Sequence, residues 1–265
     1  MATVWLFLIN VLIWGSTWIA IKLQVGEVPA LLSVTYRFTI AVILLFIICW
    51  VQKKPFPKFT LNDHLWMVVQ GLFMFCLNIV FFFLAMEYLV SGLVAVVFSS
   101  VIIFNTIFSA LIFKARLSRP VIIGAVLGLI GLILVFWQEI ILFDFVASAT
   151  ELGFCYGLLS AILTSGGNMV SAHLQKKGCS VLHNMAWGML YGLLWTLFLV
   201  LVTDVKWVMD WSFSYILPLL YLAIAGSIVA FWCYLTLLGR LGPSNAAYVM
   251  VMTPIVALIM VLLTK

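Results

Sequence analysis

Residues 3–21 read TVWLFLINVLIWGSTWIAI, a run without a single charged side chain. Runs of this kind recur along the whole chain, which is 66% hydrophobic and 8% charged. An average soluble domain is about 45–50% apolar and about 25% charged, so this composition cannot build a water-soluble surface. Lipid offers the backbone no hydrogen-bond partners, and runs of about 20 apolar residues therefore select membrane-spanning helices.

The sequence predicts an all-α integral membrane protein, a polytopic bundle of about nine transmembrane helices. The predicted spans are 3–21, 31–50, 65–86, 92–113, 120–137, 152–172, 182–203, 213–236 and 244–263. Among the prolines, Pro254 is the one that lies deep in a span. Three G-x-x-x-G pairs, which allow close approach of helix backbones, predict helix contacts. They are Gly124 with Gly128, Gly153 with Gly157, and Gly188 with Gly192.

The positive charges are divided unequally between the two sets of alternate loops. One set holds Lys53, Lys54, Lys58, Lys114, Arg116, Arg119, Lys176, Lys177 and Arg240. The other set holds Lys22, Lys206 and Lys265. Cytoplasmic loops keep an excess of Lys and Arg. We therefore expect a multi-pass protein of the cell's inner (plasma) membrane with a cytoplasmic N-terminus.

The chain also resembles itself at an offset of about 150 residues. NIVFF at 78–82 lies over SIVAF at 227–231, Gly15 lies over Gly166, and SSVIIF at 99–104 lies over VMTPIV at 251–256. The offset corresponds to five spans, an odd number, so the second copy enters the membrane from the opposite face. The predicted units are residues 1–138 and 150–265. Inverted repeats recur in secondary transporters, with the substrate site near the midplane between the copies.

Several motifs resemble the EamA-like branch of the drug/metabolite transporter superfamily over essentially the whole chain. They are WGSTWIAIK at 14–22, YRF at 36–38, and Thr253-Pro254. The resemblance implies a ten-helix inverted-repeat carrier, commonly an exporter of amino acids or related metabolites, that works by alternating access from a central cavity. The chain departs from the family pattern where Phe113 to Leu117 replace a Gly-Glu pair. The sequence also reaches Lys265 before the tenth helix that the resemblance implies, so that helix is expected to be missing.

Arg37 is the strongest candidate for binding a substrate. It lies about six residues inside the second span, roughly 9 Å at 1.5 Å per residue. A guanidinium at this depth can bind a carboxylate through two parallel hydrogen bonds. Lys22 lies at a span end, where it either binds substrate or extends to the membrane surface. No Asp or Glu lies deep within a predicted span, which favours a zwitterion or an anion over a cationic drug.

The other candidates are polar and aromatic residues inside the spans. Asn78 and Asn168 are favoured because the repeat sets them over Ser227 and Thr17, which are also polar. Amides in spans also bond across helices, and aromatic rings also pack in the core, so those roles remain open. Pro254 frees a carbonyl that either kinks the helix or faces the substrate. The predicted substrate-binding residues are Trp14, Thr17, Lys22, Tyr36, Arg37, Asn78, Asn168, Trp187, Tyr191, Tyr248 and Pro254.

The sequence lacks a G-x-S-x-G elbow and a phosphate-binding loop. Its three histidines lack metal spacing, its five cysteines are interpreted as core residues, and no basic face suggests nucleic-acid binding. We therefore predict no enzyme, cofactor or metal, and expect a monomer whose partners are a small-molecule substrate and membrane lipid. The predicted function is export of an amino acid or related zwitterion or anion by alternating access. The alternatives are a truncated, non-transporting membrane protein or an exporter of cationic drugs, which aromatic rings could bind.

Overall fold

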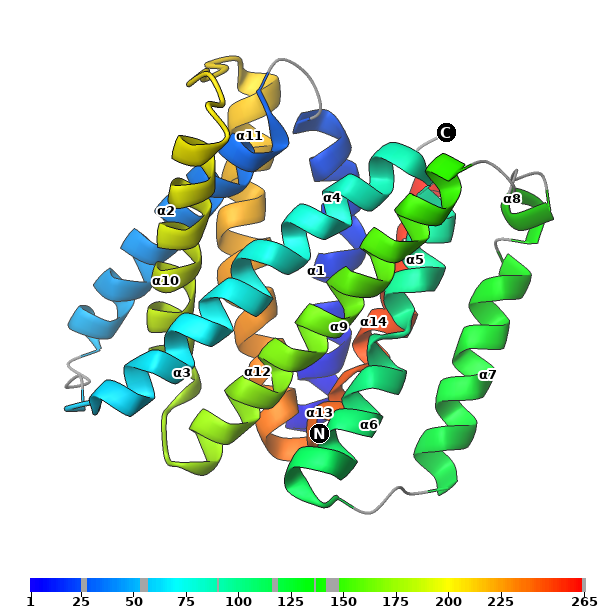
Figure 1. Ribbon diagram of the computed structural model, residues 1–265, viewed down its shortest axis with the longest axis horizontal. Coiled ribbons are helices and arrows are strands. Elements are labelled where there is room, and N and C mark those ends of the chain that lie inside the picture. Colours follow the sequence, from blue (N-terminus) through cyan, green and yellow to red (C-terminus); the bar gives the residue numbers. More distant parts are fainter. Residues whose placement is uncertain are drawn as a thin grey trace.

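The computed structural model describes residues 1–24, 28–52, 57–89, 91–115, 119–135, 137–141 and 148–263, and its regular elements are all helices (Figure 1). Seven helical segments in these ranges are long and apolar enough to cross a membrane. The predicted all-helical membrane bundle is therefore confirmed. Of the cations used above to predict orientation, Lys53, Lys54, Arg116 and Lys265 lie outside the described residues.

Each predicted span corresponds to one helix or to a few consecutive helices. The elements are α1 (Ala2–Gln24), α2 (Ala30–Val51), α3 (Leu61–Leu72), η1 (Phe73–Leu77), α4 (Asn78–Tyr88), α5 (Ser91–Ser99), α6 (Val101–Phe113), α7 (Arg119–Val135), α8 (Trp137–Ile141), α9 (Ser148–Lys176), α10 (Val181–Val202), α11 (Phe213–Tyr221), η2 (Leu222–Val229), α12 (Ala230–Leu241), α13 (Pro243–Ala246) and α14 (Tyr248–Leu263). The third span is α3–η1–α4, the fourth α5–α6, the eighth α11–η2–α12 and the ninth α13–α14.

Local chemistry sets several helix ends. Thr60 caps α3, because its side chain accepts a hydrogen bond from the Asp63 backbone N–H while the Asp63 carboxylate accepts one from the Thr60 backbone. The same carboxylate pairs with Lys177 at 3.4 Å, which ties the start of α3 to the end of α9. Gly242 ends α12 with a φ of +83°, a value that favours glycine, and Pro243 then begins α13.

Consecutive spans run in opposite directions, and equivalent spans of the two predicted copies are antiparallel. In Figure 1, α1 rises from the lower end of the bundle, whereas α9 descends from the upper end. The third and eighth spans also share a feature that the sequence analysis missed. Each contains a π-helical segment, and these begin at Phe73 and Leu222. Those two positions are related by the same offset that superimposes NIVFF on SIVAF.

Helix α9 packs against α3, η1, α4, α5 and α6, and its second half is largely buried. It carries a series of buried polar residues, namely Ser160, Thr164, Ser165, Asn168 and Ser171. Helix α1 packs against α12 and α14, and α10 packs between α2 and α3. Helix α7 lies at the edge of the bundle in Figure 1 and contacts α14 and α5. Polar residues therefore gather around α9, where other helices cover them.

The predicted glycine contacts are present. A methyl group at Gly124 would meet Tyr248 of α14, and one at Gly157 would meet Val97 of α5. The closest approach joins α3 to α10. There, a Cβ atom on Gly71 would lie 2.6 Å from the Gly192 backbone nitrogen and 2.9 Å from the Gly188 carbonyl oxygen. Backbone atoms cannot give way as a flexible side chain can.

Replacement of Gly71 by alanine should therefore destabilise the bundle. Overpacking of this kind costs about 1–3 kcal/mol, so we expect Gly71→Ala to lower the apparent melting temperature in detergent by several degrees. Gly131→Ala is the matched control, because a Cβ atom on Gly131 would meet nothing within 4 Å. Equal melting temperatures for the two variants would contradict the described contact between α3 and α10.

Candidate substrate-binding site

A cavity of about 170 Å³ lies in the centre of the bundle. Its walls come from α1, α2, η1, α4, α5, α9, α12 and α14, so both predicted copies contribute. The residues that α1 and α4 provide belong to the second half of each span. The cavity therefore occupies the middle of the bundle and extends toward the end at which α1 and α4 stop.

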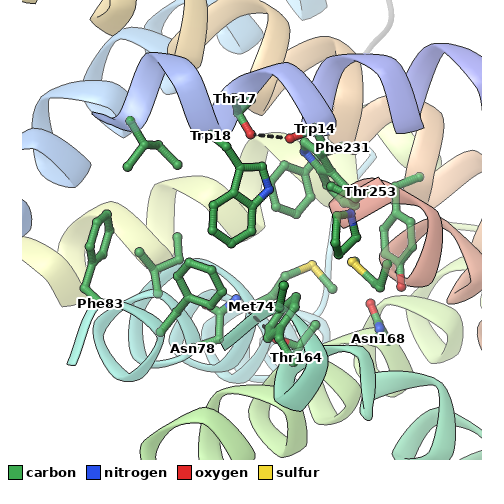
Figure 2. Close-up of a pocket in the computed structure, with 18 of the residues that line it drawn as sticks. Trp14, Thr17, Trp18, Met74, Asn78, Phe83, Thr164, Asn168, Phe231 and Thr253 are labelled. Carbon is green, nitrogen blue, oxygen red and sulfur yellow. Dashed lines mark hydrogen bonds between the residues drawn. The ribbon is translucent and has the colours of Figure 1, made fainter. Parts of the chain in front are cut away.

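Aromatic rings form much of the wall. Trp14 and Trp18 project from α1, and the Trp14 ring lies 5.2 Å from the Phe231 ring of α12. The Trp18 ring lies 5.7 Å from the Phe82 ring of α4. Figure 2 shows Thr17 and Trp18 on the α1 side, with Met74 and Asn78 facing them from the η1–α4 side. The cavity thus suits a substrate with an apolar body.

Arg37 brings a positive charge to this apolar wall. Its Nε–H donates to Ser227 Oγ at 2.6 Å, and the Ser227 hydroxyl donates to the Leu222 carbonyl at 3.0 Å. This chain of hydrogen bonds fixes the guanidinium. Within the described ranges, no hydrogen bond occupies its two terminal nitrogens, and no Asp or Glu is among the residues lining the cavity. Arg37 therefore presents donors without a counter-charge.

The π-helical segments position these polar groups. A π turn displaces carbonyls from the regular helical ladder and often occurs at functional sites. In η2, the Gly226 carbonyl accepts a hydrogen bond from the Trp14 indole at 3.1 Å. Directly after η1, the Asn78 backbone carbonyl accepts one from the Ser160 hydroxyl at 2.7 Å. Both segments thus link their helix to a partner from the other copy.

A polar layer, which we call the septum, closes the cavity toward the lower end in Figure 1. It consists of Asn105, Asn168 and Tyr234. The Asn168 amide donates to Asn105 Oδ1 at 3.2 Å, and the Asn105 amide donates to the Pro243 carbonyl at 2.9 Å. Tyr234 is buried next to both asparagines, and its hydroxyl makes no hydrogen bond within the described residues. The septum joins α6, α9, α12 and the start of α13.

A second pocket of about 660 Å³ lies on the other side of the septum. Lys176 and Arg240 are the cations in its lining. Along α9, Asn168 lines the cavity and Ala172, one turn later, lines the second pocket. Tyr234 and Leu238 stand in the same relation on α12. The septum is therefore about one helical turn thick, roughly 5.4 Å.

Six of the predicted substrate-binding residues line the cavity, namely Trp14, Thr17, Arg37, Asn78, Asn168 and Pro254. For Pro254 the sequence left two roles open, a kink in the helix and a freed carbonyl that faces the substrate. The residue lines the cavity, and a proline at position 254 has no N–H to donate to the Met250 carbonyl. Ser99 Oγ of a neighbouring helix lies 3.4 Å from that carbonyl, but its shorter hydrogen bond, at 2.7 Å, goes to the Ala95 carbonyl of its own helix. No comparison tests the role of these six residues in binding, which remains a prediction.

The structure does not bring the other five to the cavity. Lys22 is exposed in the last turn of α1. The Tyr36 hydroxyl donates to the Val208 carbonyl in the α10–α11 connection, at 3.1 Å. Trp187 and Tyr191 pack at the α3–α10 contact, where the Tyr191 hydroxyl lies 2.9 Å from His64 Nδ1. The Tyr248 hydroxyl donates to the Val121 carbonyl of α7 at 2.9 Å. Apart from the exposed Lys22, these side chains have structural partners away from the cavity.

The cavity also contains residues that were absent from the predicted set. They include Met74, Thr164, Phe231, Tyr234 and Thr253. Helical spacing could have identified two of them. Phe231 and Tyr234 follow Ser227 at intervals of four and three residues, so the three residues share a helix face. Trp232, an aromatic residue beside them, is 44% exposed on the outer surface.

The comparisons with known proteins agree with this architecture. The EamA-like transporter family matches residues 1–137 and, a second time, residues 151–264. The chain belongs to this family. The resemblance found in its sequence is thereby confirmed, and family membership identifies a multi-pass membrane transporter.

Three relatives of this EamA-like protein cover nearly all of it. An uncharacterized transporter, YoaV of Bacillus subtilis, is 28% identical over 97% of this chain and 87% of its own length. Protein PagO of Salmonella typhimurium is 26% identical over 95% of this chain and 81% of its own. A probable amino-acid metabolite efflux pump of the same organism is 25% identical, with 96% and 83% covered. A crystal structure of another protein shares the fold, with a TM-score of 0.74, 18% identity, and coverage of 97% and 87%.

Loss of Asn105 should open the septum. Asn105→Ala removes both hydrogen bonds of this residue and leaves the Pro243 carbonyl without its donor. In a cysteine-free variant that carries Ile79→Cys in the cavity, we expect an impermeant maleimide applied from the side of Lys176 and Arg240 to label several-fold faster. Asn62→Ala, an exposed amide on α3, is the control. An unchanged labelling rate with Asn105→Ala would show that the septum does not limit access.

Proposed function

We propose that this protein is a secondary transporter that exports a small metabolite carrying a carboxylate, an amino acid or a related zwitterion or anion. The observation that carries the proposal is the Arg37 guanidinium in the cavity wall, with free donors and no acidic neighbour among the residues lining the cavity. Polar and charged residues within the membrane are costly and commonly mark substrate pathways. A substrate carboxylate would supply the missing counter-charge.

The surroundings of Arg37 strengthen such binding. Charge-assisted hydrogen bonds are roughly twice as strong as neutral ones, and an apolar cavity screens the attraction less than water does. Ser227 holds Nε in place, which leaves the terminal nitrogens to make the contact. The same charge repels a cation, so an exporter of cationic drugs is the weaker alternative despite the aromatic walls.

Alternating access is the mechanism that we infer. The central cavity and the second pocket lie on opposite sides of the one-turn septum, and both predicted copies, residues 1–138 and 150–265, contribute walls. In transporters built from inverted repeats, one unit moves against the other around a fixed central site. The sequence carries no nucleotide-binding loop, so we propose that ion gradients or the substrate's own gradient drive transport, with no catalytic step.

The orientation follows from charge. Lys58, Lys114, Lys176, Lys177 and Arg240 belong to the loops and helix ends at the lower end of Figure 1, which the positive-inside rule assigns to the cytoplasm. We propose that the N-terminus is cytoplasmic, that the membrane is the cell's inner membrane, and that a monomer carries out transport. The second pocket then faces the cytoplasm and the central cavity faces outward.

Efflux from proteoliposomes tests the function. Vesicles loaded with single labelled amino acids or related acids should release at least one of them faster than protein-free vesicles. Arg37→Ala should reduce that flux roughly tenfold or more, because a hydrogen bond to a charged group contributes about 1.5–3 kcal/mol. Lys206→Ala, which removes an exposed cation near the outer end of α10, should leave the flux unchanged.

Two results would overturn this proposal. Equal flux in Arg37→Ala and the parent protein would contradict binding of a carboxylate by Arg37. Absence of flux for every compound would instead favour the alternative of a non-transporting membrane protein.

Orientation can be measured by cysteine labelling in intact cells. Burial raises the pKa of the Cys179 thiol to about 11, with a smaller contribution from Asp63, so little reactive thiolate is present at pH 7. Cys49, Cys76 and Cys233 are buried, and the exposed Cys155 is replaced by serine, so little background labelling is expected. An impermeant maleimide should label Lys206→Cys and leave Lys58→Cys unlabelled. The reverse pattern would place the N-terminus outside.

A further inference from the structure

Asn78 lies on the cavity wall formed by α4, and two hydrogen bonds fix its position against α9. The Ser160 hydroxyl donates to its backbone carbonyl at 2.7 Å. Its side-chain Nδ2 donates to Thr164 Oγ1 at 3.3 Å. The residue is thus held by both its backbone and its amide nitrogen, and it is 9% exposed.

The direction of these bonds determines which way the amide faces. The Thr164 hydroxyl gives its proton to the Ser160 carbonyl at 2.8 Å, and a carbonyl can only accept. Thr164 Oγ1 can therefore only accept from Asn78, so the NH₂ group must point toward Thr164. An amide turned by 180° would set two acceptors against each other. Asn78 Oδ1 is consequently the atom that Thr164 leaves unbound.

Asn78 Oδ1 is buried and has no hydrogen-bond partner in the described part of the chain. An unpaired buried acceptor costs about 1–3 kcal/mol. Asn168 also lines the cavity and also has an unpaired buried oxygen, but its amide donates to Asn105 and belongs to the septum. Asn184 also has an unpaired buried oxygen, but it does not line the cavity. Asn78 therefore combines a cavity position on α4, away from the septum, with an acceptor that no neighbouring side chain addresses.

Arg37 and Asn78 approach the cavity from different walls. A Cβ atom built on Gly226 would lie 3.5 Å from Arg37 Nη2 and 3.1 Å from Thr17 Cγ2, so the guanidinium reaches the α1 wall beside Thr17. Figure 2 shows Thr17 on that wall and Asn78 on the facing helix. A strong donor and a free acceptor are therefore presented across an apolar space.

We propose that Asn78 Oδ1 binds a hydrogen-bond donor of the substrate, an ammonium or a hydroxyl group, while Arg37 binds its carboxylate. The proposal rests on the function proposed above and narrows the substrate class. A carboxylate with an apolar body and no donor would leave the Asn78 oxygen unpaired where that body displaces water from the cavity wall. Asn78 would then select substrates by the presence of that donor.

Four compounds with the same aromatic body separate the possibilities. Phenylalanine carries an ammonium next to the carboxylate, 3-phenyllactate carries a hydroxyl there, 3-(4-hydroxyphenyl)propanoate carries a hydroxyl at the far end, and 3-phenylpropanoate carries no donor. Binding is measured by tryptophan fluorescence of the purified protein, and flux in proteoliposomes. At least one donor-bearing compound should bind about tenfold more tightly than 3-phenylpropanoate. Which compound does so shows whether the donor that Asn78 binds lies beside the carboxylate or at the far end of the molecule.

Substitution of Asn78 should remove this preference. In Asn78→Leu, the compounds should bind with equal affinity, while Arg37→Ala should weaken all four. Asn184→Leu, the loss of a buried amide outside the cavity, should keep the tenfold preference. Where Asn78→Leu fails to fold, Asn78→Asp provides the test, because a carboxylate at this position should raise the preference for phenylalanine over 3-phenyllactate.

Each other outcome has a defined meaning. Wild-type protein that binds 3-phenylpropanoate as tightly as the other three would overturn the proposal and leave the role of Arg37 intact. A preference that persists in Asn78→Leu, or that is unchanged in Asn78→Asp, would show that another group accepts the donor. Absence of binding and flux for all four compounds would count against the proposed function itself, and the role of Asn78 would fall with it.

Discussion

Lipid cannot satisfy polar groups, and this constraint determines where such groups lie in the present fold. Almost every buried amide or hydroxyl in the described spans is bonded to another helix or to its own backbone, and many of them gather around α9. The carbonyls that irregular turns release find partners in the same way. Trp14 reaches the Gly226 carbonyl of η2, and Ser99 approaches the Met250 carbonyl near Pro254. The polar interior and the irregular helices are therefore one feature, located where the two predicted copies meet.

Arg37 stands out against this background because it is a charged group whose hydrogen bonds are only partly satisfied. Its Nε is held by Ser227, which in turn bonds to the first residue of η2, so the position of the guanidinium depends on the π segment. If this segment were a regular α-helix, the Ser227 side chain would point in a different direction around the helix axis. The recurrence of a π segment at the matching position of the third span indicates that both copies use the same device. In the first copy it precedes Asn78, and in the second it contains Ser227.

The sequence predicted the helical spans and the position of Arg37 at a central cavity, because both follow from the cost of polar groups in lipid. The sequence was a weaker guide to which side chains point toward the cavity and which pack elsewhere. Trp187, Tyr191 and Tyr248 are apolar enough for either the cavity or the core, and their actual neighbours, His64 and the α7 backbone, come from distant parts of the chain. The π segments shift helical phase without a recognisable residue pattern, so the sequence did not show whether the cavity face of the eighth span holds Phe231 and Tyr234 or Trp232. Long-range contacts settle such questions.

The thinness of the septum has an electrical consequence. When water fills the space on both of its sides, the membrane potential falls mainly across the single helical turn between them. An elementary charge that crosses the full potential gains or loses about 2.3 kcal/mol for each 100 mV. A molecule with net negative charge would experience most of that change over a displacement of a few ångströms, and a negative cell interior would push it outward. The voltage sensitivity of the transport cycle would then depend on this narrow layer rather than on the full width of the bilayer.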